Sequence, residues 1–241
     1  MTETKETRPG ASLASGSPEA KRTARFLVAR FEKWFLPRVA ERLPRFILPD
    51  HLTGLGVLAA SAISAAYMLS NHHPAWLWAA NIGLVFHWLG DSLDGTLARV
   101  RHIQRPRYGF YLDHLTDAYS TVVIGLGLGL SPYMLLAVAL ALVAMYLVLS
   151  INVYLETYVL GEFRYGYGWL GPTEARIALI LLNGIALTTG PLPFRLFGIV
   201  MTAYDVMGVV LVVSMIGLLL RRAARNLGTL GRLEPANVVK D

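Results

Sequence analysis

The chain has 241 residues, of which 54% are hydrophobic and only 16% are charged, and its formal net charge is +6. Soluble domains carry roughly 25% charged residues, so this composition predicts an integral membrane protein. The basic residues flank apolar runs, which is typical of membrane topology and contact with anionic lipid rather than of nucleic-acid binding. The absence of cysteine excludes a disulfide framework, a thiolate metal site and a cysteine nucleophile.

The first segment of the chain, residues 1–16, is polar and is predicted to be a disordered tail. Ser17-Pro18 is typical of a helix start, because an N-cap residue precedes a proline at the first helical position. Residues 17–47 then interleave apolar and basic side chains at helical spacing, among them Phe31, Trp34 and Lys33. We expect an amphipathic juxtamembrane helix on the membrane surface. A helix that packs on the end of the bundle is the alternative.

Six apolar segments of membrane-spanning length follow, because a transmembrane helix needs about 20 apolar residues. The predicted fold class is therefore an all-α integral membrane protein with six transmembrane helices and the N-terminal amphipathic helix. The six-helix domain is expected over residues 48–222, with a cytoplasmic tail over 223–241. The predicted spans are Leu52 to Ser70, Pro74 to Arg99, Gly109 to Leu130, Tyr133 to Leu160, Thr173 to Thr189 and Phe194 to Leu220.

The distribution of Lys and Arg predicts the orientation of these spans. With six spans, both termini and the second and fourth loops share one side of the membrane. That side receives every Lys and Arg except Arg195, if Arg176 is counted at the start of the fifth span. The positive-inside rule then places both termini in the cytoplasm.

Two glycines in the third span, Gly125 and Gly129, form a small-xxx-small pair. Such pairs let two helices approach closely. We interpret this one mainly as close packing inside the protomer, with a homodimer face as the alternative.

Four aspartates occupy the second and third spans. Asp91 and Asp94 share a helix face at i,i+3, and Asp113 and Asp117 share one at i,i+4. At about 1.5 Å per residue, the first pair lies roughly 7 and 12 Å before Arg99. The second pair lies at matching depth, roughly 6 and 12 Å after the start of the third span. The antiparallel hairpin should therefore bring both pairs to one cleft below the cytoplasmic surface.

Unpaired acid in lipid costs roughly 2.5–3.5 kcal/mol per Asp on insertion scales, so a divalent cation is expected among these carboxylates. Oxygen ligands select Mg²⁺, Mn²⁺ or Ca²⁺, and two metal ions can clamp the oxygens of a phosphoryl displacement. One carboxylate can then serve as general base. Gly95, Ala98 and Gly109 leave space for a ligand, and Arg99 can hold a phosphate. A polar packing group or an acid–arginine pair is the structural alternative.

At these residues the sequence resembles the CDP-alcohol phosphotransferase family, whose signature is D-x-x-D-G-x-x-A-R followed after about eight residues by G-x-x-x-D-x-x-x-D. The chain departs from it in having nine residues between Arg99 and Gly109. An extra loop residue costs little. The matching positions are Asp91, Asp94, Gly95, Ala98, Arg99, Gly109, Asp113 and Asp117.

The resemblance implies roles for these residues. Asp91, Asp94 and Asp113 would hold two Mg²⁺ or Mn²⁺ ions. Asp117 would lie near the metal and would also be the base that deprotonates the acceptor. Gly95, Ala98 and Gly109 would line the cytidine pocket, and Arg99 would meet a donor phosphate.

The resemblance also implies the reaction: a phospholipid-synthesis transferase in which an alcohol attacks a CDP-linked donor and releases CMP at the cytoplasmic side. The family often begins its first span with Pro-Asn-x-x-Thr near the nucleotide. Here the element reads Pro49-Asp50-His51-Leu52-Thr53, with Asp in place of Asn. Thr53 is therefore expected to contact the donor.

The acceptor alcohol is not specified by the motif. Asn152 and Glu156 share a face of the fourth span and are candidates, although a helix-to-helix hydrogen bond explains Glu156 as well. Arg164 and Arg176 are candidates for a phosphorylated acceptor, or else anchor helix ends. The tyrosines near Glu156 fit an interfacial aromatic belt, or a cradle for a quaternary ammonium.

An ion-coupled membrane transporter, with the aspartates as its cation site, is the alternative function. It would require helix breaks near the bilayer midplane and an internal repeat. Neither is visible in the sequence, and acids near one membrane face fit an active site better.

Overall fold

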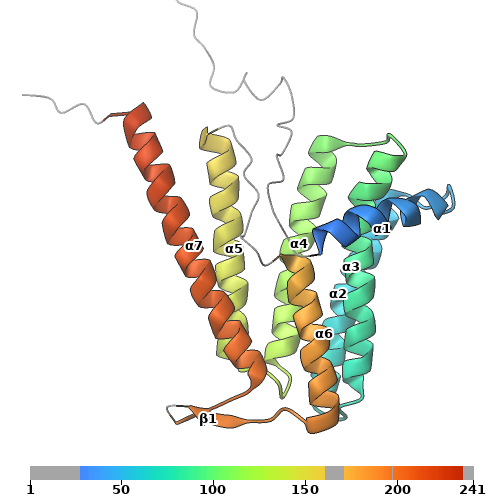
Figure 1. Cartoon of the computed structure of the whole chain (residues 1–241), viewed down its shortest axis with the longest axis vertical. Helices are drawn as coiled ribbons and strands as arrows, with labels where there is room; N and C mark the ends of the chain where they lie inside the picture. Colours follow the sequence, from blue (N-terminus) through green and yellow to red (C-terminus); the bar gives the residue numbers. More distant parts are fainter. Residues whose placement is uncertain (1–27, 161–170, 197, 236–241) are drawn as a thin grey trace, which may run out of the picture.

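The computed structural model describes residues 28–160, 171–196 and 198–235. The predicted tail 1–16, the start of the predicted surface helix and Arg164 lie outside them. Within the described residues the chain forms seven helices and one two-stranded antiparallel hairpin (Figure 1). The elements are α1 (Ala29–Arg42), α2 (Pro49–Leu69), α3 (Trp76–Val100), α4 (Pro106–Gly129), α5 (Leu136–Leu160), α6 (Pro172–Thr189), β1 (Phe194–Leu196), β2 (Ile199–Met201) and α7 (Ala203–Leu233).

Three of the described helices, α2, α5 and α7, are long and apolar enough to cross a membrane by length and composition. Large apolar side chains such as Leu58, Leu181 and Val213 face outward, as in a protein surrounded by lipid. Helices α3, α4 and α6 match the predicted second, third and fifth spans in position and carry the polar residues of the candidate site. That these three also span the membrane stays a prediction, as does the orientation.

The predicted start of the sixth span at Phe194 is wrong. Residues from Phe194 to Met201 form the β1–β2 hairpin, and α7 begins at Ala203. Thr202 caps this helix: its hydroxyl accepts from the Tyr204 N–H at 3.2 Å, and its own N–H donates to Asp205 at 2.8 Å. This reciprocal capping fixes the helix start there. At its other end α7 continues to Leu233, beyond the predicted end at Leu220 and into the predicted tail.

Helix α1 lies across the bundle and packs against α3 (Figure 1). Leu36 and Ala40 are buried on one face, whereas Phe31 and Trp34 are exposed. The helix is thus amphipathic, inside the predicted range 17–47, but it ends at Arg42, and its position on a membrane surface stays a prediction. Arg101, at the end of α3, donates to four backbone carbonyls of the linker that follows α1, those of Leu43, Pro44, Arg45 and Ile47, at 2.8, 2.9, 3.4 and 2.6 Å.

Helices α2 and α3 are in close backbone contact. A Cβ atom at Gly90 would lie 2.6 Å from the Gly56 nitrogen and 2.7 Å from the Leu52 carbonyl oxygen. Only glycine leaves room for this approach. The contact holds the part of α3 that carries Asp91 directly against α2.

Helices α4 and α5 meet at the glycine pair of the third predicted span. A Cβ atom at Gly125 would lie 2.4 Å from Val143, and one at Gly129 would lie 2.8 Å from the Ala139 side chain. The interpretation of this pair as close helix packing inside the protomer is confirmed. Figure 1 shows α5 and α7 diverging from α4 and α6 toward the end of the molecule near α1.

A buried polar network joins four helices in the core. Asn183 of α6 is fully buried and bonds with the Tyr67 hydroxyl at 3.1–3.2 Å, accepts from Tyr204 at 2.8 Å and donates to Asn81 at 2.7 Å. Because each partner lies on a different helix, the network fixes α6 relative to α2, α3 and α7.

The α2–α3 contact generates a stability prediction. Gly90→Ala should force the two backbones apart and lower the free energy of unfolding by about 1–3 kcal/mol, the usual cost of overpacking. The thermal unfolding midpoint of the protein in detergent measures this. Gly54→Ala, on α2, is the matched control because its Cβ would meet no described atom within 4 Å. A Gly90→Ala midpoint at or above that of the wild type would contradict the account.

Candidate functional site

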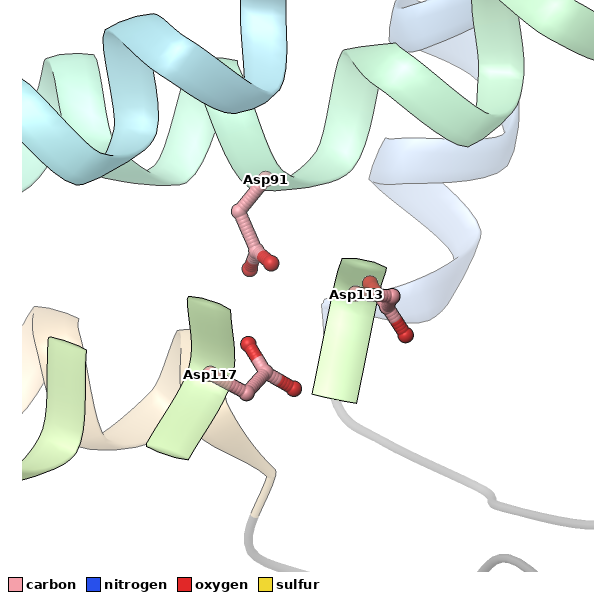
Figure 2. A group of neighbouring side chains, drawn as sticks. All are labelled: Asp91, Asp113 and Asp117. Atoms are coloured by element: carbon pink, nitrogen blue, oxygen red, sulfur yellow. The ribbon is translucent and has the colours of Figure 1, made fainter. Parts of the chain in front are cut away.

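Three carboxylates from two antiparallel helices meet in one cluster (Figure 2). Asp91 belongs to α3, and Asp113 and Asp117 belong to successive turns of α4. Each offers a carboxylate oxygen, and these oxygens all lie within 4.8 Å of one another. All three residues are half-buried. Such an arrangement can hold a divalent cation, since carboxylate oxygens are the ligands that Mg²⁺ and Mn²⁺ prefer.

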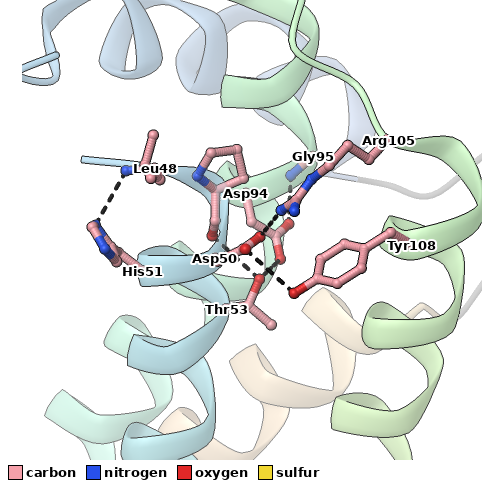
Figure 3. Close-up of polar contacts among 9 residues, drawn as sticks. Leu48, Asp50, His51, Thr53, Asp94, Gly95, Arg105 and Tyr108 are labelled. Carbon is pink, nitrogen blue, oxygen red and sulfur yellow. Dashed lines mark hydrogen bonds and ion pairs between the residues drawn. The ribbon is translucent and has the colours of Figure 1, made fainter. Parts of the chain in front are cut away.

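The fourth aspartate of the predicted set, Asp94, is engaged with another helix. Its carboxylate accepts a hydrogen bond from the Thr53 hydroxyl at 2.7 Å and one from the Gly95 N–H at 2.5 Å (Figure 3). Thr53 comes from the first turns of α2, so this bond ties α2 to the motif helix. The structure thus groups three of the predicted ligands and places the fourth beside the predicted donor-contacting residue.

An arginine from α6 reaches the cluster. The Arg176 guanidinium donates to the Asp91 carboxylate at 2.7 Å and to the His87 ring nitrogen Nδ1 at 3.1 Å. The Arg176 side chain is only 12% exposed, so this ion pair is largely shielded from water. His87 lies one helical turn before Asp91, and this i,i+4 spacing puts both side chains on the same face of α3. The sequence indicates Arg176 as a candidate for the acceptor or as a helix-end anchor, and the structure places it against Asp91.

The small residues of the motif border the carboxylates, and Arg99 lies on the next turn. The Arg99 guanidinium donates to the Thr96 hydroxyl at 3.0 Å. A Cβ atom at Gly95 would come within 3.4 Å of that guanidinium, whereas one at Gly109 would meet no described atom within 4 Å. Ala98 is half-buried. Open space therefore exists at Gly109.

Sequence reasoning missed a second group of contacts, at Asp50. The Arg105 guanidinium is paired with one oxygen of the Asp50 carboxylate, and the Tyr108 hydroxyl donates to the other at 3.3 Å (Figure 3). Arg105 also lies over the Tyr108 ring, 3.9 Å from its centroid. The hydrogen bond from Arg105 to Asp50 raises the pKa of this guanidinium above its usual value. The one sign of these contacts in the sequence is that Asp50 stands where the Pro-Asn-x-x-Thr element has asparagine.

The remaining acceptor candidates lie elsewhere. Glu156 is buried between α5 and α7, with Arg225 at 3.3 Å and Arg222 at 3.7 Å from its carboxylate oxygens. This geometry matches the helix-to-helix contact that was the alternative explanation of Glu156. The Asn152 amide nitrogen is buried and has no hydrogen-bond partner among the described residues. Arg164 is outside those residues.

Comparison with known proteins assigns the chain to a family. The family model described as CDP-alcohol phosphatidyltransferase matches residues 46–222, most of the chain and all of the α2–α6 region that builds the site. No curated protein matches the sequence. Members of this family are membrane transferases of phospholipid synthesis that use a divalent metal ion, and the aspartate cluster lies inside the matched range. The chain therefore belongs to the CDP-alcohol phosphatidyltransferase family.

Proposed function

We propose that this protein transfers a phosphatidyl or other substituted phospho group from a CDP-linked donor to an alcohol and releases CMP. The observation that carries the proposal is the meeting of Asp91, Asp113 and Asp117 within 4.8 Å inside the range matched by the family. Acidic side chains in a membrane protein are costly and are usually retained for function.

The donor set of the cluster fits a hard divalent cation. Asp91, Asp113 and Asp117 supply oxygen ligands only, and Arg176 supplies one of the positive charges that three neighbouring carboxylates require. We propose that these aspartates, with Asp94, hold two Mg²⁺ or Mn²⁺ ions. When bound, such ions would neutralise the pyrophosphate charge and stabilise the leaving phosphate.

We assign the general base to Asp117. The acceptor hydroxyl gives its proton to the Asp117 carboxylate as its oxygen forms the new bond to phosphorus, and the bond from that phosphorus to the CMP oxygen breaks. No covalent enzyme intermediate is needed. The proposed donor contacts are Thr53, Gly95, Ala98, Arg99 and Gly109.

Two neighbouring side chains are proposed to keep the carboxylates in position. The Thr53 hydroxyl orients Asp94, and Arg176 holds one oxygen of Asp91. Among the acceptor candidates we favour Arg176, because it lies at the aspartate cluster. A guanidinium at this position would contact the phosphate of a phosphorylated acceptor. Asn152 and Arg164 remain proposals for the acceptor region. We further propose that the site and both termini face the cytoplasm.

A donor–acceptor panel tests the activity. Purified protein with radiolabelled CDP-diacylglycerol, Mg²⁺ or Mn²⁺ and a set of alcohols, including phosphorylated ones, should release CMP with at least one acceptor. Omitting the alcohol or adding EDTA is the control, and each should abolish release. Absence of CMP release with every pair, together with cation flux in liposomes, would favour the transporter alternative instead.

The base assignment is tested by Asp117→Asn. This nearly isosteric change removes the proton acceptor, so CMP release should fall by at least about a hundredfold, the usual lower bound for general-base catalysis. Size-exclusion behaviour and the unfolding midpoint should stay close to those of the wild type. Glu41→Gln, an exposed acid on α1, is the matched control. Retained activity in Asp117→Asn would refute the assignment.

A further inference from the structure

We propose that Glu32 of α1 is a positioning residue for the aspartate cluster: its carboxylate fixes the start of α6 relative to α3, and so sets where the Arg176 guanidinium meets Asp91. The inference rests on the proposed function only in treating this cluster as the catalytic site. It gives a part in the site to α1, which lies outside the range 46–222 that the family model matches.

The Glu32 carboxylate joins two helices of the bundle through one oxygen. Oε1 accepts a hydrogen bond from the Thr173 hydroxyl of α6 at 2.7 Å and another from the Trp88 indole N–H of α3 at 2.9 Å. All three residues are half-buried. Hydrogen bonds to a carboxylate are about twice as strong as those between neutral groups. Glu32 therefore holds α6 beside α3 at this level of the bundle.

Helix α1 is itself fixed on α3, which gives Glu32 a defined position. Apolar side chains of both helices form one buried cluster, which includes Leu36, Ala40, Leu93 and Leu97. The Phe35 ring of α1 stacks on the Trp88 ring, with centroids 6.1 Å apart. The same contact holds the indole whose N–H reaches Glu32. A side chain on a packed helix can orient its partners more precisely than one on a loop.

A second carboxylate reinforces the link from the α6 side. Glu174 is buried; one of its oxygens accepts from the Gly171 N–H at 3.0 Å and the other from the Val28 N–H at 3.3 Å. The first bond caps the start of α6. The second ties that start to the residue immediately before α1. Thr173 and Glu174, which are successive residues of α6, thus both bond to the α1 segment.

Each partner of Glu32 lies one helical turn from the Arg176–Asp91 ion pair. Thr173 precedes Arg176 by three residues, and Trp88 precedes Asp91 by three, which is about 4.5 Å of helical rise in each case. Residues at i,i+3 share a helix face. The Glu32 contact and the ion pair therefore connect the same faces of α3 and α6, and a shift of α6 at Thr173 would move Arg176 with it.

Arg176 lies between two anchors of α6. Asn183 holds the helix two turns beyond Arg176 through its buried network, and Thr173 is bound one turn before it. The guanidinium bonds to two defined atoms, Asp91 Oδ2 and His87 Nδ1, so its function depends on where the helix start lies. A misplacement of about 1 Å that originates far from the chemistry can cost about a hundredfold in rate.

Removing the hydroxyl of Thr173 tests the link with little change of shape. Thr173→Val should lower CMP release from CDP-diacylglycerol about tenfold, the lower end of the effect of losing a partner that orients a site residue. Thr173→Ser keeps a hydroxyl donor and should restore most of the activity. Thr188→Val is the matched control on α6, because the exposed Thr188 hydroxyl donates to a carbonyl of its own helix.

Substitutions of Glu32 separate positioning from a general loss of stability. Glu32→Ala removes both bonds and should lower CMP release at least as much as Thr173→Val. Glu32→Gln should retain most of the activity, because an amide oxygen accepts both bonds. Glu41→Ala, at an exposed acid of α1, should behave as the wild type does. In an Arg176→Gln background Glu32→Ala should cause no further loss, since its effect passes through the guanidinium.

A distance measurement tests the positioning itself, without turnover. The chain has no cysteine, so spin labels can be attached to two introduced ones: Ile177→Cys, beside Arg176, and Leu58→Cys on α2, both at exposed sites. Double electron–electron resonance should give a broader or displaced distance distribution in Glu32→Ala and in Thr173→Val than in the wild type. Labels at Leu181→Cys and Leu58→Cys are the control, because Leu181 lies beside the Asn183 anchor and should not move.

Unchanged distances between the labels at 177 and 58 in both Glu32→Ala and Thr173→Val would overturn the inference. Strictly additive activity losses of Glu32→Ala and Arg176→Gln would overturn it as well. If either occurred while the wild type released CMP, only the assignment of Glu32 would fail. If the distances changed as expected but the wild type released no CMP with any acceptor, the proposed function would fail and the role of Glu32 in placing Arg176 would stand.

Discussion

The mutual repulsion of Asp91, Asp113 and Asp117 is the constraint on which the rest of the structure depends. Like charges at this separation repel one another and push their helices apart, more strongly in a low-dielectric region than in water. The fold opposes this through α2, which packs against both α3 and α4. Its contact with α3 is closest at Gly90, where a side chain would collide with the α2 backbone. It also places a cation, Arg176, on one of the carboxylates. Helix packing and charge compensation therefore act on the same few residues.

Helix α6 connects the core to this cluster. Asn183 and Arg176 are seven residues apart, two turns of one helix, and so lie on the same face. Asn183 is fixed by the buried network with Tyr67, Asn81 and Tyr204, and Arg176 reaches Asp91 and His87. The same network therefore sets the position of the guanidinium at the acid cluster. Asp94 depends on α2 in a comparable way, through Thr53.

The local spacing of the sequence predicted much of this site, and long-range partners account for what it missed. The i,i+3 and i,i+4 pairs and the antiparallel hairpin placed Asp91, Asp113 and Asp117 together. The glycine pair predicted close helix packing inside the protomer, and the structure shows that the partner helix is α5. The pairing of Arg176 with Asp91, and of Arg105 with Asp50, depends on tertiary packing. The periodicity of the sequence does not encode such packing. The β1–β2 hairpin was missed because a short apolar run is also typical of a helix start. The i,i+3 spacing places Asp94 on the same helix face as Asp91. In the structure, however, the Asp94 carboxylate accepts a hydrogen bond from Thr53 of α2.

Binding of Mn²⁺ to the purified protein, followed by the electron paramagnetic resonance signal of the free ion, tests the central claim most directly. The account predicts that the wild type takes up Mn²⁺ and that Asp91→Asn, Asp113→Asn and Asp117→Asn each weaken this binding at least about tenfold, the lower end of the effect of losing even an outer-shell partner. Glu41→Gln should bind as the wild type does. Equal uptake by the wild type and the three aspartate variants would contradict the assignment of this cluster as a metal site.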